Sequence, residues 1–186
     1  KSPEGIAAAL YYIVHSTLAG AALFLIVDLV KSSRSSLALT PMPPIAGAPL
    51  TAGLFFAGAI AMTGLPPLSG FIGKLLILDA SFDTAMAPWI WAIILGASLI
   101  SVVGFARAGS IVFWKAKGLA VDDDLEVGET PRPLAFLAVG GLIAMLLALT
   151  VFGGYVQDYM IATSEQLFAP EPYIQIVTET EGKLSG

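Results

Sequence analysis

The stretch TGLPPLSGFIGK, residues 63–74, decides how this chain is expected to fold. It lies inside an apolar segment, about 49–84, that is longer than the roughly 20 residues needed to cross a bilayer. Its two prolines lack a backbone N–H, and its glycines permit non-helical dihedrals, so we predict a helix that is broken near 64–70. The residues expected to form the break are Gly64, Pro66, Pro67, Ser69, Gly70 and Gly73.

The composition places this break in a membrane. Of the 186 residues, 56% are hydrophobic and 12% are charged, about half the charged fraction of a typical soluble domain. The net charge of -5 offers no basic surface, so no nucleic acid is expected as a partner. With no cysteine and a single histidine, we expect neither a metal site nor a cofactor. We therefore predict an integral membrane protein with the lipid bilayer around it.

Four apolar segments are long enough to be transmembrane helices, which makes the predicted fold all-α. They cover about 6–30, 49–84, 88–114 and 134–156, with the second discontinuous, and a polar C-terminal tail follows at 157–186. The acidic run that begins at Asp122 is interpreted as a solvated loop. Because the chain starts at Lys1 with no targeting peptide before the first span, we expect a fragment or processed product.

Loop charges predict the orientation of the chain. Lys31 and Arg34 follow the first predicted helix, and Lys115, Lys117 and Arg132 surround the loop after the third. Since cytoplasmic loops collect Lys and Arg, both termini are expected on the outer side. Aromatic residues near span ends are interpreted as an interfacial belt: Tyr11, Tyr12, Trp89, Trp91, Trp114 and Tyr155.

Lys74 is the charge closest to the predicted break. It lies seven residues past Pro67, which is roughly 10 Å along a helix. A lysine removed from water loses part of its preference for the charged form, so Lys74 is a candidate for accepting and releasing a proton. The alternative is a lysine that extends from a helix end toward the headgroups.

Three other polar residues lie within the predicted spans. His15 is near the middle of the first one and has two open interpretations, a proton relay or a structural hydrogen bond. Asp28 is expected to pair with Lys31, three residues later on the same helix face. Arg107 is expected to pair with a carboxylate or carbonyl from a neighbouring helix. Asp28 and Arg107 are thus interpreted as structural or accessory charges.

Four stretches of this sequence resemble the antiporter-like subunits shared by Mrp-type multisubunit sodium/proton antiporters and respiratory complex I. GLPPLSGFIGK, residues 64–74, is similar to the family's broken-helix signature, and YYIVHSTLAGAALFLIVDL, residues 11–29, is similar to the preceding helix. RAGSIVFWK, residues 107–115, and APEPYI, residues 169–174, resemble the C-terminal region of the D-type subunit of Mrp antiporters. One position departs from several complex I homologues, which carry a lysine where this chain has Ala19.

The resemblance implies the C-terminal portion of a transporter subunit rather than an enzyme. It implies proton translocation coupled to Na+ in a multi-pass protein of the cell membrane, plasma or inner, with the other Mrp subunits as partners. Lys74, and His15 beside it, would form the proton path. Two alternatives stay open: a proton-pumping membrane subunit of an NADH-quinone oxidoreductase, and a purely structural membrane subunit.

Overall fold

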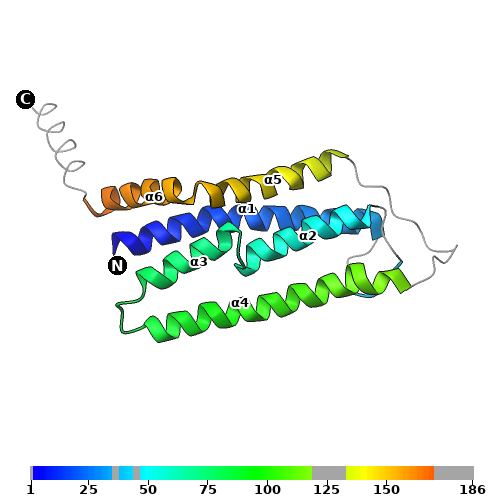
Figure 1. Ribbon diagram of the computed structural model, residues 1–186, viewed down its shortest axis with the longest axis horizontal. Coiled ribbons are helices and arrows are strands. Elements are labelled where there is room, and N and C mark those ends of the chain that lie inside the picture. Colours follow the sequence, from blue (N-terminus) through cyan, green and yellow to red (C-terminus); the bar gives the residue numbers. More distant parts are fainter. Residues whose placement is uncertain (1, 35–37, 44–46, 119–132, 170–186) are drawn as a thin grey trace, which may run out of the picture.

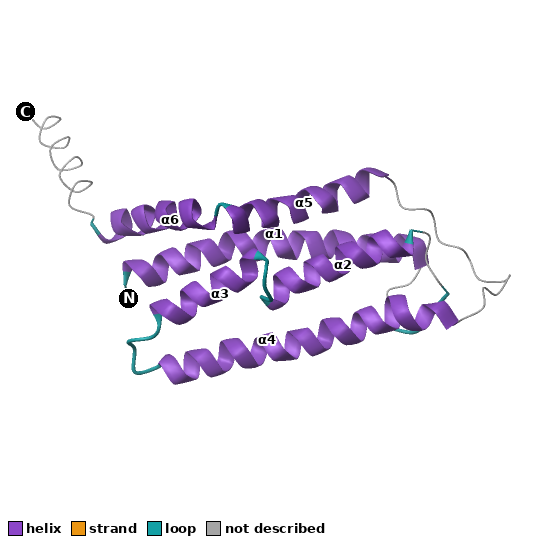
Figure 2. Cartoon of the chain, viewed as in Figure 1, coloured by secondary structure: helices purple, strands orange, loops and turns teal. Residues whose placement is uncertain are grey.

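The computed structural model describes residues 2–34, 38–43, 47–118 and 133–169, and the regular structure in these ranges is helical (Figures 1 and 2). The elements in chain order are α1 (Pro3–Arg34), α2 (Ala48–Thr63), α3 (Ser69–Ala80), α4 (Ala87–Gly109), the π-helix η1 (Ser110–Trp114), the 3-10 helix η2 (Lys115–Gly118), α5 (Pro133–Val151) and α6 (Gly153–Phe168).

Helix α1 is the central element of the bundle. It packs against α2 and α3 as well as against α5 and α6, while α4 packs on α2 and α3 (Figure 1). The side chains that α1 buries completely include Ala7, Ala19 and Ala22. Small side chains let helix backbones approach closely, which is how helices in a membrane gain van der Waals contact. The alanines of α1 therefore allow its neighbours to surround it.

Three described helices are long and apolar enough to cross a membrane: Pro3–Arg34, Ala87–Trp114 and Pro133–Val151. The fourth predicted span is divided into α2, with 16 residues, and α3, with 12. At 1.5 Å per residue these helices are roughly 24 and 18 Å long, and each alone is shorter than the ~30 Å hydrocarbon core. The count of four spans thus stays a prediction, whereas the all-helical class is confirmed.

The C-terminal part differs from the expected single helix over 134–156. Helix α5 ends at Val151, and α6 begins at Gly153 and continues to Phe168, so part of the predicted polar tail is helical. The Ser164 hydroxyl donates a hydrogen bond of 2.6 Å to the Pro3 carbonyl, which ties α6 to the start of α1. The end of α6 and the beginning of α1 therefore lie at the same end of the bundle. The tail beyond residue 169 lies outside the described residues.

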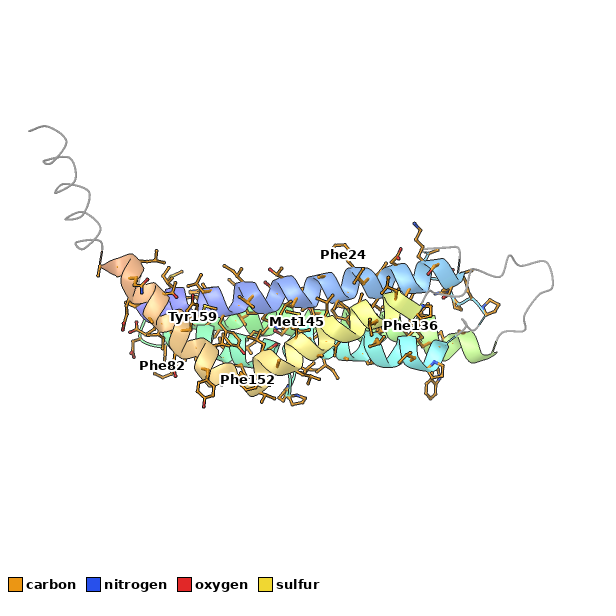
Figure 3. The ribbon with its side chains drawn as sticks, turned by 90° about the horizontal axis from the view of Figure 1, so that it is seen from above. Phe24, Phe82, Phe136, Met145, Phe152 and Tyr159 are labelled. Carbon is orange, nitrogen blue, oxygen red and sulfur yellow. The ribbon has the colours of Figure 1, made fainter. Side chains whose placement is uncertain are left out.

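The outer surface of the bundle is apolar. Phe24, which is 80% exposed, projects away from α1, as Figure 3 shows. Trp89, Leu99 and Leu134 are also largely exposed on α4 and α5. Soluble monomers rarely expose contiguous apolar surface on this scale. The surface agrees with a chain that is surrounded by lipid and by other apolar protein segments.

Candidate functional site: the interruption between α2 and α3

The interruption begins at Gly64, directly after the last residue of α2. Its φ of 75° lies in the left-handed region, which glycine adopts without a Cβ clash. The Gly64 N–H bonds the Ala61 carbonyl at 3.2 Å, and the Leu65 N–H bonds the Ile60 carbonyl at 3.1 Å. This pair of hydrogen bonds is the Schellman pattern that ends many helices. A Cβ at position 64 would also lie 2.7 Å from Cδ of Lys74, so Gly64 leaves room for the lysine side chain.

Pro67 explains why a main-chain oxygen is open at the end of α2. In a continuous helix the N–H of residue 67 would bond the carbonyl of Thr63, four residues earlier, but proline has no N–H. The Lys74 side chain bends back toward the break and donates a hydrogen bond of 2.6 Å to this Thr63 carbonyl. A cation is favourable there, because the C-terminal end of a helix carries partial negative charge.

The second partner of Lys74 comes from another helix. Its Nζ donates to the Ser98 hydroxyl of α4 at 2.7 Å. No carboxylate in the described ranges pairs with Lys74, whose side chain is partly rather than fully buried. Both acceptors are neutral dipoles. The amine can consequently lose a proton without separating an ion pair.

His15 contacts the α3 side of the interruption. Its ring is completely buried, and its Nδ1 shares a hydrogen bond of 2.9 Å with the Ser69 hydroxyl at the start of α3. The opposite ring nitrogen, Nε2, has no hydrogen-bond partner among the described residues. A histidine with one nitrogen held and the other open has a defined orientation and a free position for a proton or a lone pair. Both open interpretations of His15 remain compatible with this geometry.

Gly70 allows α3 to approach α2 and α1 closely. A Cβ at this position would collide with the Ala61 carbonyl oxygen and would lie 2.9 Å from Nε2 of His15. Gly73, one turn further along α3, faces Tyr12 of α1, where a Cβ would be 3.0 Å from Cδ2. Two of the predicted break glycines are thus needed for close packing rather than for an unusual dihedral.

Tyr12 lies near His15 and lines the same cavity as Lys74. Its ring centre lies 5.6 Å from that of His15. Tyr12 also lines a cavity of about 280 Å³ between α1, α2, α3 and α4, together with Lys74, Ser98 and Ser101. The sequence interpretation placed Tyr12 in an interfacial belt and did not single out either serine. The available signal was that Ser98 and Ser101 interrupt a span that is otherwise almost entirely apolar.

The remaining charged residues lie away from this interruption. Asp28 and Lys31 are both exposed on α1, and no ion pair joins them in the described structure. The expected pairing is therefore not formed among the described residues. Arg107 is exposed in the last turn of α4, and no described carboxylate or carbonyl contacts it. The acidic run at 122–129 lies outside the described residues.

Tyr11 corrects one further expectation. Its side chain is completely buried against α5, and its hydroxyl donates a hydrogen bond of 3.1 Å to the Leu149 carbonyl. This carbonyl belongs to the last turn of α5, next to the interruption at Phe152. Tyr11 is thus a core residue that satisfies a helix end, while Trp114 and Tyr155 are exposed as expected for belt residues.

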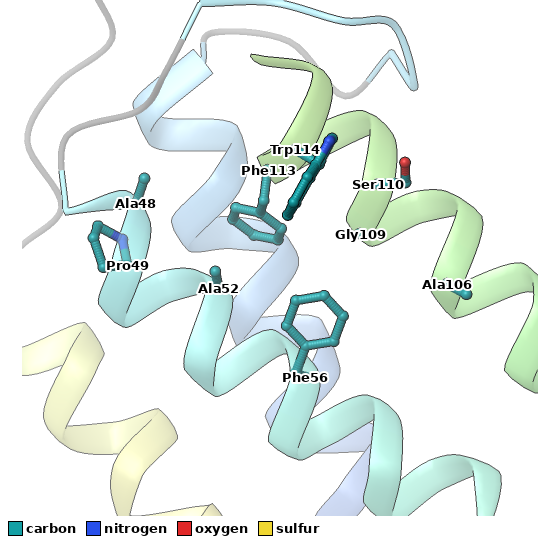
Figure 4. Close-up of a pocket in the computed structure, with 9 residues that line it drawn as sticks. All are labelled: Ala48, Pro49, Ala52, Phe56, Ala106, Gly109, Ser110, Phe113 and Trp114. Carbon is teal, nitrogen blue, oxygen red and sulfur yellow. The ribbon is translucent and has the colours of Figure 1, made fainter. Parts of the chain in front are cut away.

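A larger cavity, of about 610 Å³, lies between α2 and the end of α4 (Figure 4). It is lined by Ala48, Pro49, Ala52, Phe56, Ala106, Gly109, Ser110, Phe113 and Trp114. A lining with one hydroxyl and otherwise apolar side chains offers little to an ion. Across the described ranges no group of three His, Asp or Glu side chains that could hold a metal is present. The polar chemistry gathers instead at the α2–α3 interruption.

Long apolar helices around an interruption that holds a lysine and a histidine define a multi-pass membrane protein. Comparison with protein families identifies which one. The model described as NADH:quinone oxidoreductase/Mrp antiporter, TM, matches residues 1–101. The chain belongs to this family of membrane subunits.

Its relatives include antiporter subunits and complex I subunits. The D-type subunit of the Na(+)/H(+) antiporter of Bacillus subtilis is 32% identical over 95% of this chain and 35% of its own length. The D-type subunit of the probable K(+)/H(+) antiporter of Rhizobium meliloti is 31% identical over 89% of the chain and 35% of its own length. NADH-quinone oxidoreductase subunit 13 of Thermus thermophilus is 30% identical over 83% of the chain and 31% of its own length.

A solved structure of the Mrp complex from Dietzia sp. DQ12-45-1b shares the fold. It matches 94% of this chain and 40% of its own chain, with a TM-score of 0.71 and 22% identity. The chain thus spans about a third of the length of the curated relatives it matches. The resemblance to the D-type antiporter subunit that the motifs indicated is confirmed, and the relatives of that name are transporter subunits rather than enzymes.

Proposed function

We propose that this chain forms part of the proton path of a multisubunit monovalent cation/proton antiporter in the cell membrane. Lys74 is the relay of this path, and His15 is its neighbour across the interruption. The single observation that supports the proposal best is the position of the Lys74 amine, which is held between the Thr63 carbonyl and the Ser98 hydroxyl. An amine held by neutral acceptors beside a polar cavity can gain and lose a proton without a large rearrangement.

The relatives named as D-type antiporter subunits favour the antiporter over other membrane roles. Those relatives are named for Na+ and for K+, and the described residues contain no dense carboxylate cluster that would select between the two ions. We propose Na+ as the coupled cation, with other antiporter subunits as partners. We also keep the predicted orientation, with both termini on the outer side, as part of the proposal.

The test is replacement of Lys74 by alanine in the complete antiporter. Cation-dependent proton exchange would be measured in inverted membrane vesicles with a pH-sensitive dye, once with Na+ and once with K+. Lys74→Ala should abolish exchange while the subunits still co-purify. The matched control is Lys31→Ala, since Lys31 is exposed on α1 and makes no described ion pair. Normal exchange in Lys74→Ala would refute the relay.

Two outcomes would support the other candidates. If Lys74→Met kept exchange intact but weakened subunit assembly, Lys74 would have a structural role. If the protein co-purified with flavin and iron-sulfur subunits, the complex I-like function would replace the antiporter. That second candidate rests on the 30% identity to the Thermus thermophilus subunit.

A further inference from the structure

The Ser98 hydroxyl donates one hydrogen bond and accepts another. It donates its one proton to the Ile94 carbonyl of its own helix at 2.8 Å, and it accepts a hydrogen bond from Nζ of Lys74 at 2.7 Å. A hydroxyl has a single donor and two lone pairs. Because the Ile94 carbonyl occupies the donor, the side of Ser98 that faces Lys74 is an acceptor.

The Lys74 amine therefore has two acceptors, the Thr63 carbonyl and the Ser98 hydroxyl. A protonated amine carries three N–H groups, and a neutral amine carries two N–H groups and one lone pair. In either form, two N–H groups satisfy the two acceptors. Only the third site on Nζ of Lys74 then differs between the two forms. It holds a proton in the ammonium and a lone pair in the neutral amine.

The cavity beside Lys74 has room for water next to this third site on Nζ. Its volume of about 280 Å³ is large enough for several water molecules, each of which occupies roughly 30 Å³ in the liquid. Buried water also needs polar partners. The residues that supply them around this cavity are Tyr12, Lys74, Ser98 and Ser101.

We propose that Ser98 is a positioning residue that directs the exchangeable position of Lys74 into this cavity, and that the cavity is the hydrated route for proton exchange. In the outward step the N–H bond breaks, the proton passes to a water oxygen, and the electron pair stays on Nζ. The reverse step restores the ammonium. The inference rests on the proposed role of Lys74 and adds α4, which the break motif does not include, to the proton path.

The test compares two variants of nearly equal shape in the complete antiporter, Ser98→Thr and Ser98→Val. Threonine keeps a hydroxyl that can bond a carbonyl one turn earlier and accept from Lys74, whereas valine has a methyl group in its place. Exchange in vesicles should stay within about twofold of wild type for Ser98→Thr and fall about tenfold or more for Ser98→Val, as expected for loss of a hydrogen bond to a charged group. A packing role for Ser98 would affect both variants equally.

The control for loss of a helix hydroxyl is Thr163→Val. The Thr163 side chain is half-buried on α6, and among the described residues its hydroxyl donates to the Tyr159 carbonyl of its own helix, at 2.8 Å. This variant should exchange cations at the wild-type rate.

The two proposals fail in different ways. If Lys74→Ala abolishes exchange but Ser98→Val is as active as Ser98→Thr, the positioning role and the cavity route are overturned while the relay stands. If Lys74→Ala keeps normal exchange, the proposed function itself fails.

Discussion

Replacing Gly70 with alanine should damage the interruption without touching any charged group. The new Cβ would collide with the Ala61 carbonyl oxygen, which belongs to a helix backbone and cannot rotate away, and it would press on the His15 ring. Overpacking of this kind costs about 1–3 kcal/mol, and loss of the His15 to Ser69 hydrogen bond adds about 1 kcal/mol. We expect Gly70→Ala to lower the free energy of unfolding by about 2–4 kcal/mol in total.

The assay is denaturant unfolding of the detergent-solubilised protein, followed by cation/proton exchange in vesicles for variants that still assemble. Gly53→Ala is the matched control, because a Cβ at Gly53, also within a helix, has no described heavy atom within 4 Å. Alanine there should be neutral or slightly stabilising, since it is the better helix former. Unchanged stability in Gly70→Ala would show that α3 does not need this close approach, and the packing argument would be wrong.

Two further predictions concern helix ends. Gly64→Ala should destabilise the protein by about 1–2 kcal/mol, because alanine is unfavourable in the left-handed backbone conformation. It should also reduce exchange, because the added Cβ displaces the Lys74 side chain. Both effects are measured with the assays given for Gly70→Ala. Tyr11→Phe should cost about 1 kcal/mol of stability, since the Leu149 carbonyl loses its donor, while exchange in vesicles stays near wild type.

Different results would contradict these two predictions. Full exchange in Gly64→Ala would mean that Lys74 can reach its acceptors by another path. Complete loss of exchange in Tyr11→Phe, with normal assembly, would assign Tyr11 a role in proton transfer that its contact with Leu149 does not explain.

Local chemistry made the interruption after α2 predictable. Two prolines and a glycine lie within four residues, and each proline removes a backbone N–H that a continuous helix would use. The placement of Lys74 was harder to predict from spacing alone, because its long side chain turns back toward Thr63 instead of following the helix away from the break.

Contacts between distant residues were not predictable from the sequence. Ser98 meets Lys74 only because α4 packs beside α3, and no local pattern indicates which face of α4 points inward. The interruption at Phe152 was missed because it contains no proline, although the pair Gly153 and Gly154 was a usable signal. The spacing of Asp28 and Lys31 permits an ion pair but does not require one, since exposed pairs of this kind gain little.

The oxygen that Lys74 contacts at the end of α2 belongs to the main chain, whatever side chain residue 63 carries. Alanine-scanning mutagenesis at Thr63 would therefore leave this acceptor in place and report only on the threonine hydroxyl, which bonds the Ala59 carbonyl. Comparison of aligned sequences would also overlook this acceptor, since every amino acid has the same main-chain carbonyl oxygen. One of the two hydrogen-bond acceptors of Lys74 is thus set by the residue at which α2 ends. Variants that shift the end of α2 would test its contribution.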